Sequence, residues 1–209
     1  MAFSLNGTSY IEATSTPVTA EPFTMACWFN PAVVTDGALM SVGNSATTNR
    51  FQMNSNIAQG GSPLSISSVG ASTATANTTT AIVQNTWQHA AAVCTSTTSR
   101  SIYLNGGGKA TNTTSVTPAG INNIMTGGRW SGGTRAFFFN GRIAEVAIWN
   151  AALTDDEVLS LSKGFAPYLI RPMNLRFYNR CLRISQDLSQ GRTLTQVNIT
   201  NFDHPRIYG

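Results

Sequence analysis

The sequence predicts an all-β protein, a two-sheet antiparallel sandwich of the jelly-roll type with one short helix and an extended C-terminal arm. Three observations predict it. About a dozen short apolar or alternating segments are separated by regular turn signals such as Asn-Gly. Charged residues make up only 11% of the chain, against about 25% in a typical soluble domain, and polarity comes from Thr, Ser, Asn and Gly. Residues 154–164 alone carry both helix start and helix stop signals.

The expected strands follow one another in short steps along the chain. Phe23–Pro31 is apolar on both faces, which predicts a central strand covered on both sides. The segments 87–94, 101–104 and 109–116 are joined by short polar turns and predict a three-stranded meander. The full set of expected strands is 2–5, 10–13, 23–31, 38–42, 50–54, 64–69, 74–83, 87–94, 101–104, 109–116, 121–125 and 142–149.

The last of these strands alternates in a way that predicts one apolar and one mixed face. The apolar face would carry Ala144, Val146 and Ile148, and the mixed face Ile143, Glu145, Ala147 and Trp149.

A helix is predicted directly after this strand. Thr154 and Glu157 have the spacing of a capping box, and Leu153 and Val158 that of a hydrophobic staple. Gly164 is placed for a left-handed position after the last turn. The acidic cluster at 155–157 is therefore interpreted as helix-start chemistry and not as a metal or catalytic site.

Five motifs in a fixed order carry a family resemblance. They are F-S-L-N-G-x-x-Y-I-E at 3–12, P-F-T-M-A-C-W-F-N-P at 22–31, W-Q-H-A-A-A-V at 87–93, S-I-Y-L-N-G at 101–106 and F-N-G-R-I-A-E-V-A-I-W-N-A-A-L-T-x-x-E-V at 139–158. Together they resemble the laminin-G-like branch of the concanavalin A-like lectin and glucanase superfamily. The resemblance implies a concanavalin A-like jelly roll over residues 1–164, a fold often used to bind carbohydrate or protein.

Residues 165–209 lie outside that pattern and are predicted to form an extended basic arm. Residues 1–162 hold six Lys/Arg and seven Asp/Glu, a charge of −1, whereas residues 163–209 hold seven Lys/Arg and two Asp, a charge of +5. Such a tail suits an acidic protein surface or another polyanion as its partner, or its arginines pair locally and lie over apolar surface. The side chains proposed to fasten the arm to a partner are Arg171, Arg176, Phe177, Tyr178, Arg180 and Arg183.

The arm is similar to C-terminal extensions on laminin-G-like proteins of tailed bacteriophages, which implies a virion structural role. We expect an outer capsid decoration protein that forms a homotrimer, with the arm bound to the major capsid protein or another virion subunit. The alternative is a carbohydrate-binding module, associated with a tail or fibre, that recognises host or environmental glycans. No nucleic-acid or membrane partner is expected.

A glycan site would centre on Trp130. It lies between Arg129 and Arg135 in the glycine-rich stretch 127–135, which is expected to be an exposed loop. Its alternatives are a residue folded over the sandwich edge or a contact to a neighbouring subunit. The other three tryptophans fall at core positions of the family.

No enzyme activity and no cofactor are expected. A glycosidase needs two carboxylates about 5–10 Å apart across a cleft, and no second carboxylate follows Glu145 on its strand. His89 and His204 form no recognisable triad or zinc spacing, and His89 is assigned to the core. Calcium is disfavoured because Ala144 stands where the family's metal pattern places Asp.

The three cysteines differ in setting. Cys27 and Cys94 lie on apolar strands and are expected to be buried. Cys181 lies among arginines, which would favour its thiolate, and it is a candidate for an intersubunit disulfide. Because Met1–Ser4 has no basic or apolar leader, we expect synthesis in the host cytoplasm, without a signal peptide, and location in the virion.

Overall fold

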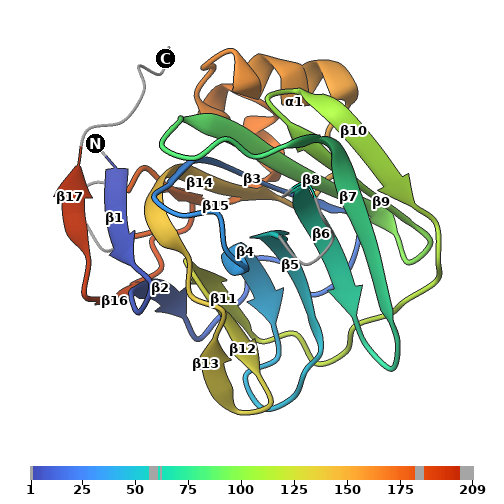
Figure 1. Ribbon diagram of the computed structural model, residues 1–209. Coiled ribbons are helices and arrows are strands. Elements are labelled where there is room, and N and C mark those ends of the chain that lie inside the picture. Colours follow the sequence, from blue (N-terminus) through green and yellow to red (C-terminus); the bar gives the residue numbers. More distant parts are fainter. Residues whose placement is uncertain (1, 57–60, 62, 182–185, 203–209) are drawn as a thin grey trace.

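Two antiparallel sheets pack face to face and form a sandwich (Figure 1), which confirms the predicted fold class. The computed structural model describes residues 2–56, 61, 63–181 and 186–202. The first sheet has the strand order β10-β9-β8-β3-β14-β1-β17, with β15 also paired to β14, and the second has the order β16-β2-β11-β4-β5-β6-β7. Strands β12 and β13 pair with each other alone.

The elements have the following bounds: β1 Ala2–Asn6, β2 Tyr10–Ala13, β3 Phe23–Pro31, β4 Gly37–Gly43, β5 Arg50–Ser55, β6 Pro63–Val69, β7 Thr73–Ala81, β8 Gln88–Ser96, β9 Ser99–Leu104, β10 Gly107–Asn112, β11 Asn123–Thr126, β12 Arg129–Ser131, β13 Thr134–Ala136, β14 Asn140–Trp149, α1 Asp155–Ser162, η2 Pro167–Leu169, η3 Pro172–Asn174, β15 Leu175–Asn179, β16 Thr195–Val197 and β17 Thr200–Phe202. No helix among them has the length and hydrophobicity needed to cross a membrane, as far as the described residues go.

The first sheet is covered on both faces. Its inner face packs on the second sheet, where the rings of Phe23 and Phe51 meet edge to face at 4.8 Å. Figure 1 shows α1 over the outer face of this sheet. A second cluster lies there, in which Ala26 and Trp149 pack with Val158 and Leu161 of α1. This double cover is why β3, which lies between β8 and β14, is apolar on both faces, as predicted.

A bulge in β14 changes which residues share a face. The pairing of β14 with β3 shifts register between Ala144 and Ala147, and Glu145 has a φ of 51°. An extra residue in one strand reverses the alternation beyond it. Ile143 therefore shares the inner core with Val146 and Ile148. The prediction placed Ile143 on the face opposite Val146 and Ile148, and it was wrong because of this bulge.

The start of α1 confirms the predicted capping box. The Glu157 amide donates to the Thr154 hydroxyl at 3.3 Å, and the Thr154 amide donates to Glu157 Oε2 at 2.7 Å. Leu153 and Val158 are both buried in the cluster beneath the helix, as the staple requires. Gly164 has the positive φ expected of it, at 95°.

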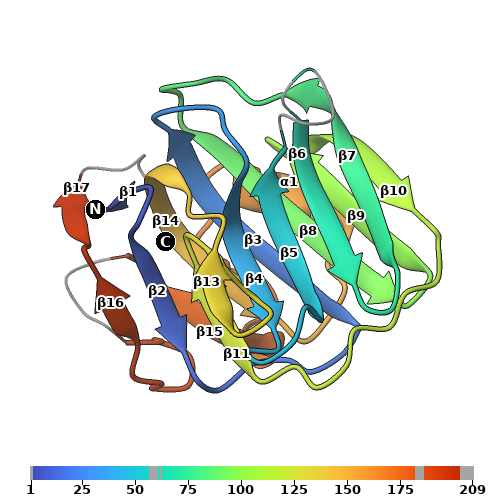
Figure 2. The ribbon, with the colours of Figure 1, turned by 60° about the horizontal axis from the view of Figure 1, so that its bottom comes forward.

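The tail is part of the sandwich, so the prediction of an extended arm is wrong for residues 165–181 and 186–202. Strand β15 pairs with β14 in the first sheet, β17 pairs with β1, and β16 pairs with β2 in the second sheet. Figure 2 shows β16 beside β2 at one edge of the molecule. Sheet pairing thus crosses the predicted boundary at residue 164, and both parts share one core.

The two aromatic residues proposed to fasten the arm to a partner are buried in this core. Phe177 is 2% exposed and packs between the sheets, while Tyr178 is 4% exposed and packs beneath α1. Their alternation along β15 sends one ring to each face of the first sheet. Neither is available to a second subunit in this fold.

The arginines proposed for the same role have mixed settings. Arg171 donates from Nε to Glu157 at 2.5 Å, and Arg180 Nε lies 3.9 Å from Glu145. Arg176 lies half-buried on β15. Arg183, like His204, lies outside the described residues. For Arg171 and Arg180 the local alternative, pairing within the chain, is therefore the one observed.

Cys181 was predicted to be a reactive thiol among arginines, and the structure shows a buried one. It is fully buried, as are Cys27 and Cys94, and all three are free thiols. Desolvation, with a smaller contribution from the charge of Glu145, raises the pKa of the Cys181 thiol well above its usual range. An intersubunit disulfide at Cys181 is therefore incompatible with this fold.

His89 lies in the core as predicted, and its burial has a measurable consequence. His89 is 2% exposed, and its ring packs edge to face on Trp28. Desolvation lowers the pKa of His89 to about 3. An unfolded histidine binds a proton near pH 6.5, so below that pH the unfolded chain holds one proton more than the folded chain. We expect the free energy of unfolding to fall by about 1.4 kcal/mol per pH unit from this group as the pH drops below 6.5.

Urea unfolding at pH 7, 6 and 5 tests this, with His89→Gln as the comparison. The variant should lack the part of the slope that one proton explains. Equal slopes for both proteins would show that His89 is already protonated in the fold.

Candidate functional site

The hairpin β12–β13 lies over the outer face of the second sheet, with β12 packed against β4 and β11. Figure 2 shows β13 in front of these strands. Ser41 on that face donates to the Gly128 carbonyl at 3.0 Å, and the Gly127 amide donates to the Leu39 carbonyl at 2.9 Å. Gly127 has a φ of 79°, a left-handed backbone conformation that glycine adopts without strain at the start of the hairpin.

The stretch 127–135 was expected to be a loop, but it forms this hairpin. Gly132 and Gly133 at its tip both have positive φ, 60° and 84°, as a two-residue type I′ turn requires. Thr134 pairs with Ser131, and Arg135 pairs with Trp130. The paired strands hold Trp130 in a fixed position over the sheet.

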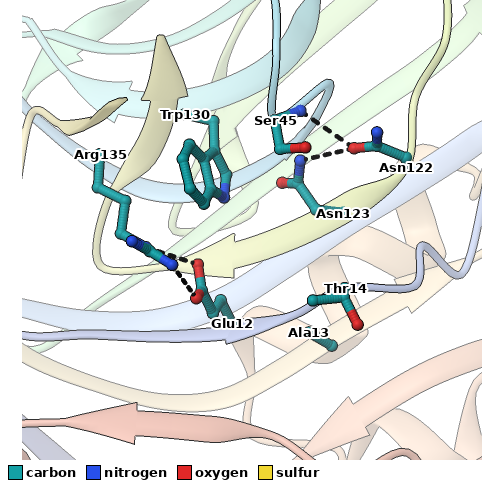
Figure 3. A pocket seen from close by; sticks show the side chains of 8 residues that line it. All are labelled: Glu12, Ala13, Thr14, Ser45, Asn122, Asn123, Trp130 and Arg135. Atoms are coloured by element: carbon teal, nitrogen blue, oxygen red, sulfur yellow. Dashed lines mark hydrogen bonds and ion pairs between the residues drawn. The ribbon is translucent and has the colours of Figure 1, made fainter. Parts of the chain in front are cut away.

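A pocket of about 220 Å³ lies beside this hairpin. We name it the Trp130 pocket, and its lining residues are Glu12, Ala13, Thr14, Ser45, Asn122, Asn123, Trp130 and Arg135. Figure 3 shows the indole of Trp130 between the side chain of Arg135 and the group of Ser45, Asn122 and Asn123, above Glu12. The indole is half-buried. Of the three residues predicted for a glycan site, Trp130 and Arg135 both line this pocket.

One wall of the pocket is an asparagine pair. Asn122 Oδ1 accepts from the Ser45 amide at 3.0 Å and from Asn123 Nδ2 at 3.0 Å. Asn123 is 3% exposed, and its Oδ1 has no hydrogen-bond partner among the residues that the structure describes. A buried acceptor without a partner costs free energy that a ligand hydroxyl would recover.

The opposite wall is an ion pair. Arg135 Nε donates to Glu12 Oε2 at 3.0 Å and Nη2 donates to Glu12 Oε1 at 2.6 Å, a bidentate pair. Its hydrogen bond to Glu12 raises the pKa of Arg135 above the usual value. The guanidinium also stacks 4.2 Å from the Trp130 ring and 5.1 Å from the Tyr10 ring. These contacts fix the orientation of the indole.

Arg129, the third residue predicted for this site, lies elsewhere. Successive residues of a strand point to opposite sides, so Trp130 lines one pocket and Arg129 lines another on the far side of the hairpin. Sequence reasoning missed Glu12, Asn122 and Asn123. Glu12 is a carboxylate on a short strand among apolar residues, which is the only sequence feature that marks it. That feature does not predict its pairing with Arg135, which lies 123 residues further along the chain.

Glu145, the carboxylate considered above for catalysis, is buried. Glu145 is 2% exposed and accepts a short hydrogen bond from the Tyr178 hydroxyl, and desolvation raises its pKa. No group of three or more His, Cys, Asp and Glu side chains that could hold a metal ion occurs in the part of the chain that the structure describes.

The two-sheet jelly roll is a lectin-like fold. The chain belongs to the concanavalin A-like lectin/glucanases superfamily, whose Laminin_G_3 family model matches residues 5–159. No curated protein matches the sequence.

Several solved structures share the fold at low identity. A putative carbohydrate binding protein from Bacteroides ovatus is 18% identical, with a TM-score of 0.66 over 98% of this chain and 60% of that one. The CBM40 of the Ruminococcus gnavus IT-sialidase, bound to α2,3 sialyllactose, is 19% identical, with a TM-score of 0.65 over 78% and 95%. Domain 4 of AbnA, a GH43 arabinanase from Geobacillus stearothermophilus in complex with arabinotriose, is 21% identical, with a TM-score of 0.63 over 77% and 76%. At these identities the likeness establishes the fold alone.

Proposed function

We propose that the protein is a non-catalytic carbohydrate-binding module that holds a glycan in the Trp130 pocket. The observation that carries the proposal is a half-buried indole, fixed by Arg135, above a pocket whose other walls are polar. Ligand pockets typically combine aromatic surface with a few placed polar groups, and a sugar ring presents both an apolar face and hydroxyls.

The polar groups of the pocket match what a sugar offers. Asn123 Oδ1 lacks a partner among the described residues and would accept a hydroxyl proton, and the Glu12 carboxylate would accept a second. Arg135 would donate to a hydroxyl or ring oxygen from whichever of its N–H groups Glu12 leaves unused. The arrangement therefore favours a neutral, hydroxyl-rich ligand.

The fold neighbours support the same class. Three of them are named as carbohydrate-binding proteins or are described with a bound sugar. The virion role predicted from the tail, with a capsid partner and a trimeric assembly, stays a prediction. Its main physical support, an exposed arm, is lost because the tail packs on its own sandwich.

A glycan array with wild type and Trp130→Ala tests the proposal. Wild type should bind at least one glycan class, and the substitution should weaken that binding at least about tenfold, or about 1.4 kcal/mol. Tyr168→Ala is the matched control, because Tyr168 is an exposed aromatic residue of the tail that does not line the pocket, and it should bind like wild type. Glycan binding that survives Trp130→Ala unchanged would contradict the assignment.

A further inference from the structure

A second pocket of about 170 Å³ lies on the other side of the hairpin, and we name it the Arg129 pocket. It lies over β4, β5 and β6 of the same sheet face. The lining residues that matter here are Asp36, Gln52, Asn54, Ser67, Arg129 and Phe137.

Arg129 is the unusual member of this pocket. It is only 9% exposed, and its Nη1 donates to Gln52 Oε1 at 2.5 Å. Its Nε is buried and has no hydrogen-bond partner among the described residues. The guanidinium lies 3.5 Å from the centre of the Phe137 ring. Arg129 therefore lines the pocket with a largely buried guanidinium that is not fully hydrogen-bonded within the described residues.

The charge around Arg129 is not balanced. Arg50 Nε donates to the same Gln52 oxygen at 2.5 Å, so two guanidiniums share one neutral acceptor. Desolvation, followed by the charge of Arg50, lowers the pKa of Arg129 to about 10, whereas Asp36 opposes this shift. Arginine side chains stay protonated in proteins, so both guanidiniums are charged at neutral pH. With the one carboxylate of Asp36, the three groups sum to +1.

Two further groups indicate what else a ligand would carry. Asn54 Oδ1 is buried without a hydrogen-bond partner in the described residues and would accept a hydroxyl proton. Phe137 is 46% exposed and has a φ of 54°. Its carbonyl accepts from the Ala38 amide at 2.8 Å, which fixes the backbone while the ring stays partly in solvent.

We propose that the Arg129 pocket binds the carboxylate of an acidic sugar, with Arg129 as the anion-binding residue. Asn54 accepts a hydroxyl of the same sugar, and Phe137 contacts its apolar face. Taking the ligand to be a sugar rests on the proposed function, whereas the anion site rests on Arg129, Arg50 and Gln52.

The test is an NMR titration of the intact protein with D-glucuronate, D-glucose and acetate. The Nε–H signal of Arg129 reports this pocket, and the indole N–H signal of Trp130 reports the other. We expect a saturable shift of the Arg129 signal with glucuronate, a response to acetate at least about tenfold weaker in affinity, and no response to glucose. No saturable shift, an equal response to glucose, or equal affinity for acetate and glucuronate would each overturn the proposal.

Variants make the test specific. Arg129→Gln should weaken glucuronate binding about 10- to 100-fold, the usual range for a hydrogen bond to a charged group. Arg176→Gln, which removes a half-buried arginine of the other sheet, should leave it unchanged. Should Arg129→Gln not fold, Asp36→Asn decides, because removing a negative charge at the pocket should strengthen binding roughly 2- to 5-fold. Unchanged or weaker binding by Asp36→Asn would count against an anion site.

The proposals for the two pockets can be contradicted independently of each other. If glucuronate shifts the Arg129 NMR signal but Trp130→Ala leaves glycan binding unchanged, the Trp130 proposal is removed and the Arg129 proposal stands. If Trp130→Ala abolishes glycan binding while glucuronate leaves the Arg129 NMR signal unchanged, the Arg129 proposal is removed and the Trp130 proposal stands.

Discussion

Phe177→Ala is expected to lower the free energy of unfolding by about 3–5 kcal/mol, the usual cost of truncating a fully buried aromatic ring. Phe177 is 2% exposed and packs between the two sheets from β15, a strand of the tail. The loss removes the ring's transfer free energy and leaves a cavity that the paired strands β14 and β15 cannot close. Urea unfolding at pH 7 measures it directly.

Phe165→Ala is the matched control, because it removes the same ring from the same tail at a position that is 49% exposed. It should cost less than about 1 kcal/mol. Equal, small effects for both variants would show that the tail is not part of the folded core. The packing of residues 165–181 and 186–202 would then be wrong, and an arm that orders on another subunit would return as the better account.

Arg100→Met is expected to cost about 2–4 kcal/mol, because it removes every hydrogen bond that the buried guanidinium donates, and one hydrogen bond to a charged group contributes about 1.5–3 kcal/mol. Arg100 is fully buried, and its Nε donates to Ser68 of the opposite sheet at 2.9 Å. Nη1 donates to the Thr114 carbonyl at 2.8 Å and to Asn112 Oδ1 at 2.9 Å, and Nη2 donates to the Thr97 carbonyl at 2.6 Å. One side chain thus joins both sheets to the loop that follows β10.

Methionine keeps most of the apolar stem, so the measured loss reports the hydrogen bonds and not the packing. Lys163→Met, at an exposed position, controls for the loss of one positive charge and should change the free energy of unfolding by less than about 0.5 kcal/mol. An Arg100→Met protein as stable as wild type would mean that the four bonds offset no more than the cost of burying the guanidinium.

Regular alternation and capping made most of the sandwich predictable from sequence. The capping box at Thr154 and Glu157 is local, since both partners lie within one helical turn. The faces of β14 were not predictable, because the bulge at Glu145 shifts the alternation and no residue type announces it. The tail strands were missed because β16 and β17 have three residues each and exist only through the edges of β2 and β1.

The candidate site was predictable only in part. Trp130 and Arg135 were predicted together because a tryptophan in a glycine-rich stretch indicates a displayed ring. Their partners Glu12, Asn122 and Asn123 come from other strands and loops, and only the fold brings them together. Arg129 was assigned to the same site by its position next to Trp130, although alternation along β12 directs it to the opposite side of the hairpin.

The most direct test of the account is a crystal structure of the protein with the strongest glycan from the array. We expect one sugar ring in the Trp130 pocket, with its apolar face on the indole and a hydroxyl within hydrogen-bond distance of Asn123 Oδ1. A glycan bound elsewhere on the sandwich, with the Trp130 pocket holding only solvent, would contradict it.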